Sequence, residues 1–539
     1  MNPLRHPAAH QIPENDLEKR GEFKDSSVNI ILSGSDSADN TLENSQISSH
    51  PDIAPTPVLL RGRLARWNAK VESFAGLEAR GITRVLPEEK HDGAAMGYLQ
   101  MFTLWFSINV VVNNLAVGFL GPLVFNLGWV DCVCLVLFAN ALSACGAAYT
   151  GTFGPQSGNR TMILGRYFMG YWPSKLACIL NVILQVGWGI IASIIAGQML
   201  SAVNGAGLTI AVGCAISALC IGLVAAFGIA ILHTYERYAW IPQVFALLVL
   251  IGSAGHNFNT SLQSIGPPGT VTANRCSFFA LQFSVAISFC TIGADFYVYY
   301  PINTSRRLTF FMTWSGMWTS LIFVNLIGVA IATGVATTPG WANAYATSSG
   351  ALLLACYDGL GAFGGFCTVL LALGGIANNA PATYAAGLSC QVLGRYPKAI
   401  PRWIWCLFLM VVELVCAVAG RDHLFNIFED FLPLMSYWVC PWLTIVFEEH
   451  ILFHTLRGVP FDWSAWEDKK RLPVGVAALL SFFIGWAGAI VGMDQVWYQG
   501  PVGSKIGGYG GDIGAWLAIA FTCVAYPPLR YLELKKFGR

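Results

Sequence analysis

A succession of long apolar runs, separated by short polar segments, occupies the chain from about residue 98 to residue 530. About 20 mostly apolar residues suffice to cross the hydrocarbon core of a bilayer as an α-helix. Twelve such runs, numbered here as spans one to twelve, lie at 99–126, 129–150, 174–200, 207–232, 238–256, 276–300, 310–335, 350–376, 402–419, 428–450, 473–493 and 513–530. Because a helix satisfies its own backbone polar groups in lipid, these runs predict an all-α polytopic membrane protein with twelve transmembrane helices.

The composition excludes several classes of protein. Charged residues make up only 11% of the chain, against about 25% in soluble proteins. A net charge of +1 provides no electrostatic footprint for nucleic acid. The 15 cysteines lie mostly inside apolar runs without metal-ligand spacing, and the nine histidines lie mostly in the tail and loops. We therefore predict no metal, no cofactor and no enzymatic activity, with the lipid bilayer as the surrounding partner.

Charge placement predicts how the chain is oriented. Residues 1–97 are polar and are predicted to form a disordered cytoplasmic tail. With that tail inside, the cytoplasmic loops carry most of the basic residues, as the positive-inside rule requires. These residues are Arg160, Arg166, Lys175, Arg237, Arg306, Arg307, Arg395, Lys398, Arg402, Arg457, Lys469, Lys470 and Arg471. An even number of spans then leaves the C-terminal tail, residues 531–539, in the cytoplasm, and Asn259 becomes an outside glycosylation candidate.

Two spans carry glycines beside polar residues at membrane depth. Span one contains Gly118 and Gly121 shortly after two asparagines, and span six contains Gly293 between a threonine and Asp295. Transporters built from inverted repeats break two helices at corresponding positions, and the solute binds at those breaks. The two spans lie five apart, so the pattern predicts helix breaks at these three glycines and a secondary transporter. Close helix packing by glycine is the alternative interpretation.

Two carboxylates are predicted to lie deep in the membrane. Asp295 follows the suspected break in span six, where uptake of a proton would make it the coupling site. A structural ion pair with a residue such as Arg306 is the equally weighted alternative. Glu413 in span nine is the other deep acid, with a packing group paired to a neighbour as the alternative interpretation.

Amide and aromatic residues at mid-span indicate a binding site for a planar heterocycle. Span eight ends near Asn378, Asn379 and Pro381, and span three carries Gln185 and Trp188. Asparagine amides offer both hydrogen-bond donors and acceptors, while a tryptophan ring offers a stacking surface that Phe289 of span six could face. Interhelical hydrogen bonds and ordinary core packing are the alternatives.

Several stretches together resemble a known family, the fungal purine-cytosine permease branch of the nucleobase-cation-symport-one family. They include Leu120–Pro122, Thr152–Pro155, Asn181–Trp188, Tyr300–Arg306 and Ile376–Pro381. The resemblance implies a five-plus-five inverted repeat of the leucine-transporter type, with repeats at 98–256 and 276–452 and two additional C-terminal helices at 473–530. It also implies a plasma-membrane importer of a purine- or cytosine-like heterocycle with a proton.

The family's binding positions are only partly matched. Trp188, Asn378 and Pro381 agree with the family, whereas apolar residues occupy four polar or tryptophan positions, namely Ala116, Ala192, Phe289 and Ala382. We therefore predict proton symport of a nucleobase-like heterocycle. The alternatives are a vitamin B6-like or specialised-metabolite heterocycle, as one relative group implies, or a non-transporting sensor on the same scaffold.

Overall fold

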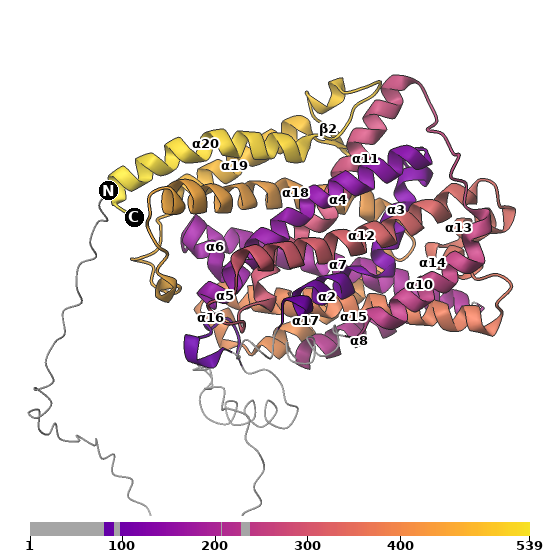
Figure 1. Ribbon diagram of the computed structural model, residues 1–539, viewed down its shortest axis with the longest axis horizontal. Helices are drawn as coiled ribbons and strands as arrows, with labels where there is room; N and C mark the ends of the chain where they lie inside the picture. The colour runs from indigo at the N-terminus through magenta and orange to yellow at the C-terminus, as the bar shows by residue number, and fades with distance from the viewer. Residues whose placement is uncertain (1–79, 91–96, 206, 228–237) are drawn as a thin grey trace, which may run out of the picture. The chain divides into compact units, whose positions relative to one another are not determined.

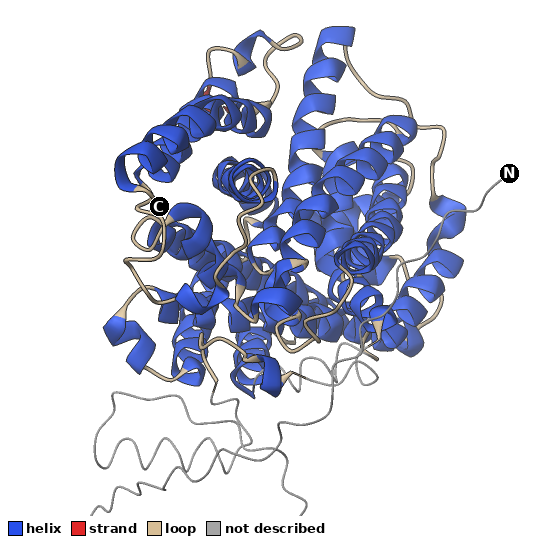
Figure 2. Cartoon of the chain, turned by 60° about the vertical axis from the view of Figure 1, so that its left-hand side comes forward, coloured by secondary structure: helices blue, strands red, loops and turns tan. Residues whose placement is uncertain are grey.

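Long helices make up most of the computed structural model, which describes residues 80–90, 97–205, 207–227 and 238–539 (Figure 1). These residues fall within one compact unit. Seven helices among them are long and apolar enough to cross a membrane, and a bent helix pair supplies an eighth candidate. Nearly all of the regular structure is helical (Figure 2). The one sheet in this part of the chain is small, with β1 (Asp494–Gln495) antiparallel to β2 (Tyr498–Gln499). The predicted tail lies largely outside the described residues.

The helices follow the order of the predicted spans. The first half contains η1 (Pro87–Glu89), α2 (Tyr98–Asn109), α3 (Val112–Leu123), α4 (Trp129–Gly151), α5 (Phe153–Ser157), α6 (Thr161–Met169), α7 (Ser174–Val203), α8 (Ile210–Phe227), α10 (Trp240–Ala254) and η2 (Gly255–Asn257). The second half contains α11 (Pro268–Ser288), η3 (Phe289–Thr291), η4 (Gly293–Phe296), α12 (Arg306–Val335), α13 (Pro339–Thr347), α14 (Ser349–Ala355), α15 (Ala362–Val392), α16 (Arg395–Ala399), α17 (Arg402–Gly420), α18 (Leu424–Glu448), η5 (Glu449–Thr455), η6 (Trp463–Ala465), α19 (Val476–Gly492), η7 (Gly503–Lys505) and α20 (Gly514–Phe537).

Span eight begins later than predicted, whereas its helical pattern in the sequence runs on toward Leu393, as the helix does. The long helix there is α15, Ala362–Val392, whereas the predicted run of 350–376 begins in the separate short helix α14. Gly359 and Gly361 adopt left-handed backbone conformations, with φ of 87° and 53°, and end the continuity between the two helices. An apolar run alone does not reveal such a turn. The predicted end of span four, beyond Phe227, lies outside the described residues.

Span one is broken, but at a different place from the prediction. Helices α2 and α3 meet at an angle of 57° across Val110 and Val111. The Asn114 amide donates to the Asn109 carbonyl over 2.8 Å and so supplies a hydrogen bond that the interrupted helix lacks. The breaks predicted at Gly118 and Gly121 are therefore wrong, because both residues lie inside α3.

Gly118 and Gly121 serve close packing. A Cβ atom on Gly118 would lie 2.3 Å from the carbonyl oxygen of Asn325 in α12. On Gly121 it would lie 2.6 Å from the sulfur of Cys132 in α4. Only glycine permits such approaches, so the alternative interpretation of these glycines holds.

Span six is interrupted where the sequence predicted. Helix α11 ends at Ser288, and the chain continues as the 3-10 turns η3 and η4. Gly293 begins η4, and a Cβ there would lie 2.5 Å from the Thr150 hydroxyl of α4. This glycine therefore combines a helix interruption with a close helix contact.

The prediction of a disordered tail up to residue 97 is wrong for residues 80–90, which are ordered against the helices. The Val85 N–H donates to the Gly158 carbonyl over 2.8 Å, and the Arg84 guanidinium donates to the Ser157 carbonyl, also over 2.8 Å. The Lys90 ammonium donates to the Pro155 carbonyl, and burial lowers the pKa of Lys90 to about 8. This strap docks on α5 and the turn after it through hydrogen bonds to backbone carbonyls, which polar composition does not reveal.

A buried ion cluster joins α18 and α20, which lie beside α19 at one edge of the molecule (Figure 1). The Arg530 guanidinium donates to both carboxylate oxygens of Glu449 over 2.7 and 3.0 Å, and to Glu533 over 2.7 Å. The Tyr526 hydroxyl also donates to Glu449 over 2.7 Å. Glu533 in turn accepts from the N–H of Ala477 in the first turn of α19. The cluster therefore ties three helices together.

Candidate functional site

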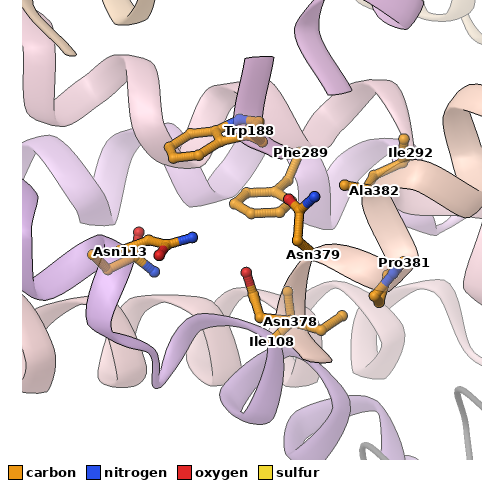
Figure 3. Close-up of a pocket in the computed structure, with 10 residues that line it drawn as sticks. Ile108, Asn113, Trp188, Phe289, Ile292, Asn378, Asn379, Pro381 and Ala382 are labelled. Carbon is orange, nitrogen blue, oxygen red and sulfur yellow. The ribbon is translucent and has the colours of Figure 1, made fainter. Parts of the chain in front are cut away.

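A buried cavity lies where the two interrupted spans meet α7 and α15 (Figure 3). Residues from α2, α3, α7, η3 and α15 and from the turn between η3 and η4 form its wall. They are Ile108, Asn113, Asn114, Trp188, Phe289, Ile292, Asn378, Asn379, Pro381 and Ala382. The structure thus brings together most of the residues that the sequence singled out for binding, although they come from four separate spans.

Two aromatic rings face the cavity in nearly parallel planes. The rings of Trp188 and Phe289 have centroids 6.3 Å apart and an interplanar angle of 18° (Figure 3). The Trp188 indole N–H donates to the Ser288 hydroxyl over 3.3 Å, and Phe431 of α18 packs edge-on against the indole. Gly187 makes room for that contact, since a Cβ there would lie 2.0 Å from the Phe431 ring. The Trp188 ring is therefore held on two sides and is oriented for stacking.

Amide groups supply the polar part of the wall. Among the described residues, the side-chain oxygen of Asn113 and the side-chain nitrogen of Asn379 have no hydrogen-bond partner. Both residues are buried, so each unmade bond is costly unless a solute completes it. Asn378 is half-buried beside them, and Pro381 lacks the N–H that would bond the carbonyl four residues earlier. A heterocycle with donor and acceptor edges complements this arrangement.

The cavity is nearly closed. It has room for about one water molecule, which is far less than a heterocycle needs. Admitting a heterocycle therefore requires the walls of the cavity to separate. The bend at Val110 and Val111 and the interruption in span six are the places where such a movement requires the fewest helical hydrogen bonds to change.

The remaining predicted binding residues lie outside the cavity wall. Gln185 is buried and donates to the Asn181 side chain over 3.0 Å and to the Thr291 hydroxyl over 3.3 Å. Ala116 and Ala192 are fully buried in the helix packing. Of the four positions that depart from the family, only Phe289 and Ala382 line the cavity.

Asp295 is buried in η4 and does not belong to the cavity wall. Its carboxylate accepts from the Thr161 N–H over 2.6 Å and from the Thr161 hydroxyl over 2.9 Å, and so caps the start of α6. The Arg160 guanidinium donates to the Asp295 carbonyl over 2.7 Å. Arg306, the partner considered from the sequence, donates instead to Gln156 over 2.6 Å. Proton coupling at Asp295 stays a prediction, but every contact here suits an ionised carboxylate.

Ile108 and Ile292 line the cavity although no sequence signal distinguished them from other apolar residues. The Asn259 side-chain oxygen accepts from the backbone N–H and the hydroxyl of Ser261, and glycosylation there stays a prediction. Among the described residues, no group of three or more His, Cys, Asp and Glu side chains could hold a metal ion.

Apolar helices around a cavity at two interrupted spans define the class of protein, which is an integral membrane transporter. The model of the family described as permease for cytosine/purines, uracil, thiamine, allantoin matches residues 86–453. The chain belongs to this permease family, and the resemblance stated from the sequence is confirmed.

Curated relatives place the chain among fungal transporters. It is 35% identical to the purine-cytosine permease fcyB of Emericella nidulans over 477 residues, covering 87% of this chain and 92% of the relative. It is 32% identical to the vitamin B6 transporter TPN1 of Saccharomyces cerevisiae over 536 residues, covering 90% and 92%. Because these relatives are transporters, the prediction that the chain is not an enzyme is confirmed.

Solved structures show the same fold. Mhp1, a nucleobase-cation-symport-1 family transporter in a closed conformation with bromovinylhydantoin bound, matches with a TM-score of 0.64 and 12% identity, covering 85% of this chain and 96% of that one. Its inward-facing conformation matches with a TM-score of 0.58 and 15% identity, covering 86% and 96%. The fold therefore extends over nearly the whole of the solved relative.

Proposed function

We propose that this protein imports a nucleobase-like heterocycle of the purine or cytosine class together with a proton. The observation that carries the proposal is the cavity itself, where two nearly parallel rings adjoin amide groups that lack partners among the described residues. The proposal includes twelve membrane spans, arranged as repeats at 98–256 and 276–452 followed by two helices within 473–530. Both termini lie in the cytoplasm, and the protein acts at the plasma membrane.

In the proposed cycle, the solute enters between the two cavity walls. Trp188 and Phe289 contact its faces, and Asn378 with Asn379 reads its hydrogen-bonding edge. Closing the walls buries the apolar faces of the ring and completes the amide hydrogen bonds. Opening on the opposite side then releases the solute into the cytoplasm.

A vitamin B6-like heterocycle is the second candidate, and one part of the wall favours it. Ala382 and Phe289 line the cavity where purine-cytosine permeases place polar or indole groups. A purine edge facing Ala382 would lose a partner, which costs about 1–3 kcal/mol. The identity to a yeast vitamin B6 transporter supports the same candidate.

Uptake of labelled cytosine, adenine, hypoxanthine and pyridoxine in a host strain without its own carriers tests the proposal. We expect at least one of these compounds to accumulate, with faster uptake at acid outside pH. Preferential uptake of pyridoxine would select the second candidate. If none is taken up although the protein reaches the plasma membrane and binds a compound of the panel, the protein is a sensor and the proposal fails.

Asn378→Ala should weaken solute binding about tenfold, which corresponds to roughly 1.4 kcal/mol for the loss of an amide contact. Competition of unlabelled solute against uptake in intact cells measures the change. Asn343→Ala is the matched control, because Asn343 is exposed on α13 and away from the cavity wall. Equal affinities of the two variants would contradict a reading role for Asn378.

A further inference from the structure

Glu413 is a carboxylic acid buried directly behind the cavity wall. Its side chain on α17 is fully buried, and one carboxyl oxygen accepts from the Thr383 hydroxyl of α15 over 3.0 Å. The other oxygen has no hydrogen-bond partner among the described residues. A Cβ on Gly189 of α7 would lie 2.4 Å from the carboxyl carbon. The carboxyl group is therefore enclosed by three helices. The residues that it approaches, Gly189 and Thr383, directly follow the cavity-wall residues Trp188 and Ala382 in the chain.

Among the described residues of the surrounding helices, no basic side chain pairs with Glu413. Helices α7, α8, α15 and α17 pack together here and carry only Lys175 and Arg402 as basic residues. Lys175 lies 14 residues before Gly189, about 21 Å along α7, and its ammonium faces the Trp172 ring at 4.4 Å. Arg402 lies three turns before Glu413, and its guanidinium donates to the carbonyls of Ala225 and Ala226 over 2.8 and 2.9 Å.

The other titratable side chains on these four helices are thiols and one phenol. Tyr384 directly follows Thr383 in the chain, and Cys406 lies about two turns before Glu413 on α17. The Cys406 sulfur faces the Ala225 and Thr383 carbonyls, and the Tyr384 ring faces the Arg402 guanidinium. The rest are Cys178, Cys214, Cys220, Cys367, Cys390 and Cys416. An unpaired carboxylate in such surroundings is strongly unfavourable, and a neutral acid avoids that penalty.

A hydrogen-bond chain connects this acid to the cavity. The Thr383 hydroxyl lies 3.0 Å from Glu413 and also 3.4 Å from the carbonyl oxygen of Asn379, a cavity-wall residue. With Glu413 ionised, the hydroxyl donates to the carboxylate. With Glu413 protonated, the acid donates to the hydroxyl oxygen, and the hydroxyl proton turns to the Asn379 carbonyl. The protonation state of Glu413 is thereby transmitted to the segment that carries Asn378 and Asn379.

We infer that Glu413 is the group that binds the coupled proton and that Thr383 relays its protonation state to the cavity wall. This inference rests on the proposed proton symport. A proton from the outside water binds the carboxylate, remains on it as the neutral acid while the solute is enclosed, and leaves to the cytoplasmic water after release. The Asp295 carboxylate has more hydrogen-bond donors than that of Glu413, since it accepts two hydrogen bonds from Thr161 and caps a helix.

Reconstituted protein in liposomes tests the inference with two measurements on each variant. One is counterflow exchange of labelled cytosine or pyridoxine without a pH gradient, and the other is accumulation driven by one unit of pH gradient. For one proton per solute the wild type should accumulate the label about tenfold. Glu413→Gln mimics the neutral acid, so exchange should persist and become independent of pH, while accumulation falls to about onefold.

Glu467→Gln is the matched control, because Glu467 is exposed and forms an ion pair with Lys398. The Glu467→Gln variant should accumulate label as the wild type does. Accumulation in Glu413→Gln, or its loss in Asp295→Asn alone, would overturn the inference while leaving proton symport intact. A wild type that exchanges label but never responds to the gradient would overturn both. If Glu413→Gln does not fold, Thr383→Val tests the relay instead. Accumulation by Thr383→Val equal to that of the wild type would rule out the relay.

Discussion

Arg530→Ala should lower the stability of the protein by about 3–5 kcal/mol, the usual result of leaving a buried charge without its partner. Glu449 is fully buried and would keep only the Tyr526 hydroxyl and the more distant His454 ring as partners. Glu533 would also lose the guanidinium contact on α20. Thermal unfolding of purified protein in detergent measures the loss.

Two further variants separate charge from packing. Lys535→Ala removes an exposed cation from the same helix and should leave the unfolding temperature unchanged. Combining Arg530→Ala with Glu449→Gln removes the unpaired charge and should restore part of the stability. If the double variant is no more stable than Arg530→Ala, the loss arises from the arginine stem and not from the buried carboxylate.

Trp188→Ala should weaken solute binding about 5- to 150-fold, because stacking of a flat heterocycle on an aromatic ring contributes about 1–3 kcal/mol. The ring is held by Ser288 and Phe431 and is nearly parallel to Phe289, so little reorganisation precedes stacking. Equilibrium binding of the labelled compound that the uptake panel identifies provides the measurement.

Matched variants define what the indole contributes. Trp188→Phe keeps an aromatic face and loses the N–H donor to Ser288, so it should retain most of the affinity. Trp172→Ala removes an exposed indole at the start of α7 and should not change binding. Affinity unaffected by Trp188→Ala would mean that the solute is not held between the two rings.

Properties of single segments could be predicted from the amino-acid sequence. Apolar runs of about 20 residues locate the helices well, because the bilayer thickness sets one length for every span. The cavity-wall residues Trp188, Asn378 and Pro381 could also be named, since amides and a mid-span tryptophan are conspicuous in an apolar context. The interruption at Gly293 was also predictable, because this glycine lies between a threonine and Asp295 within an apolar span.

Contacts between segments were decided by the tertiary structure. Glycine breaks helices and also lets them pack closely, so Gly118 and Gly121 looked like breaks, whereas the bend lies at two valines. Ala116 and Ala192 looked like cavity residues until the helix rotations placed them in the packing.

Glu413 illustrates the same limit at the level of function. Its partner Thr383 lies 30 residues away on another helix, and the two meet only because α15 and α17 pack side by side. The apolar pattern, bilayer thickness and local chemistry determine where helices and polar groups occur along the chain. Which polar groups meet depends on how whole helices are rotated and packed against one another. That packing involves residues far apart in the sequence, so a local sequence pattern does not determine it.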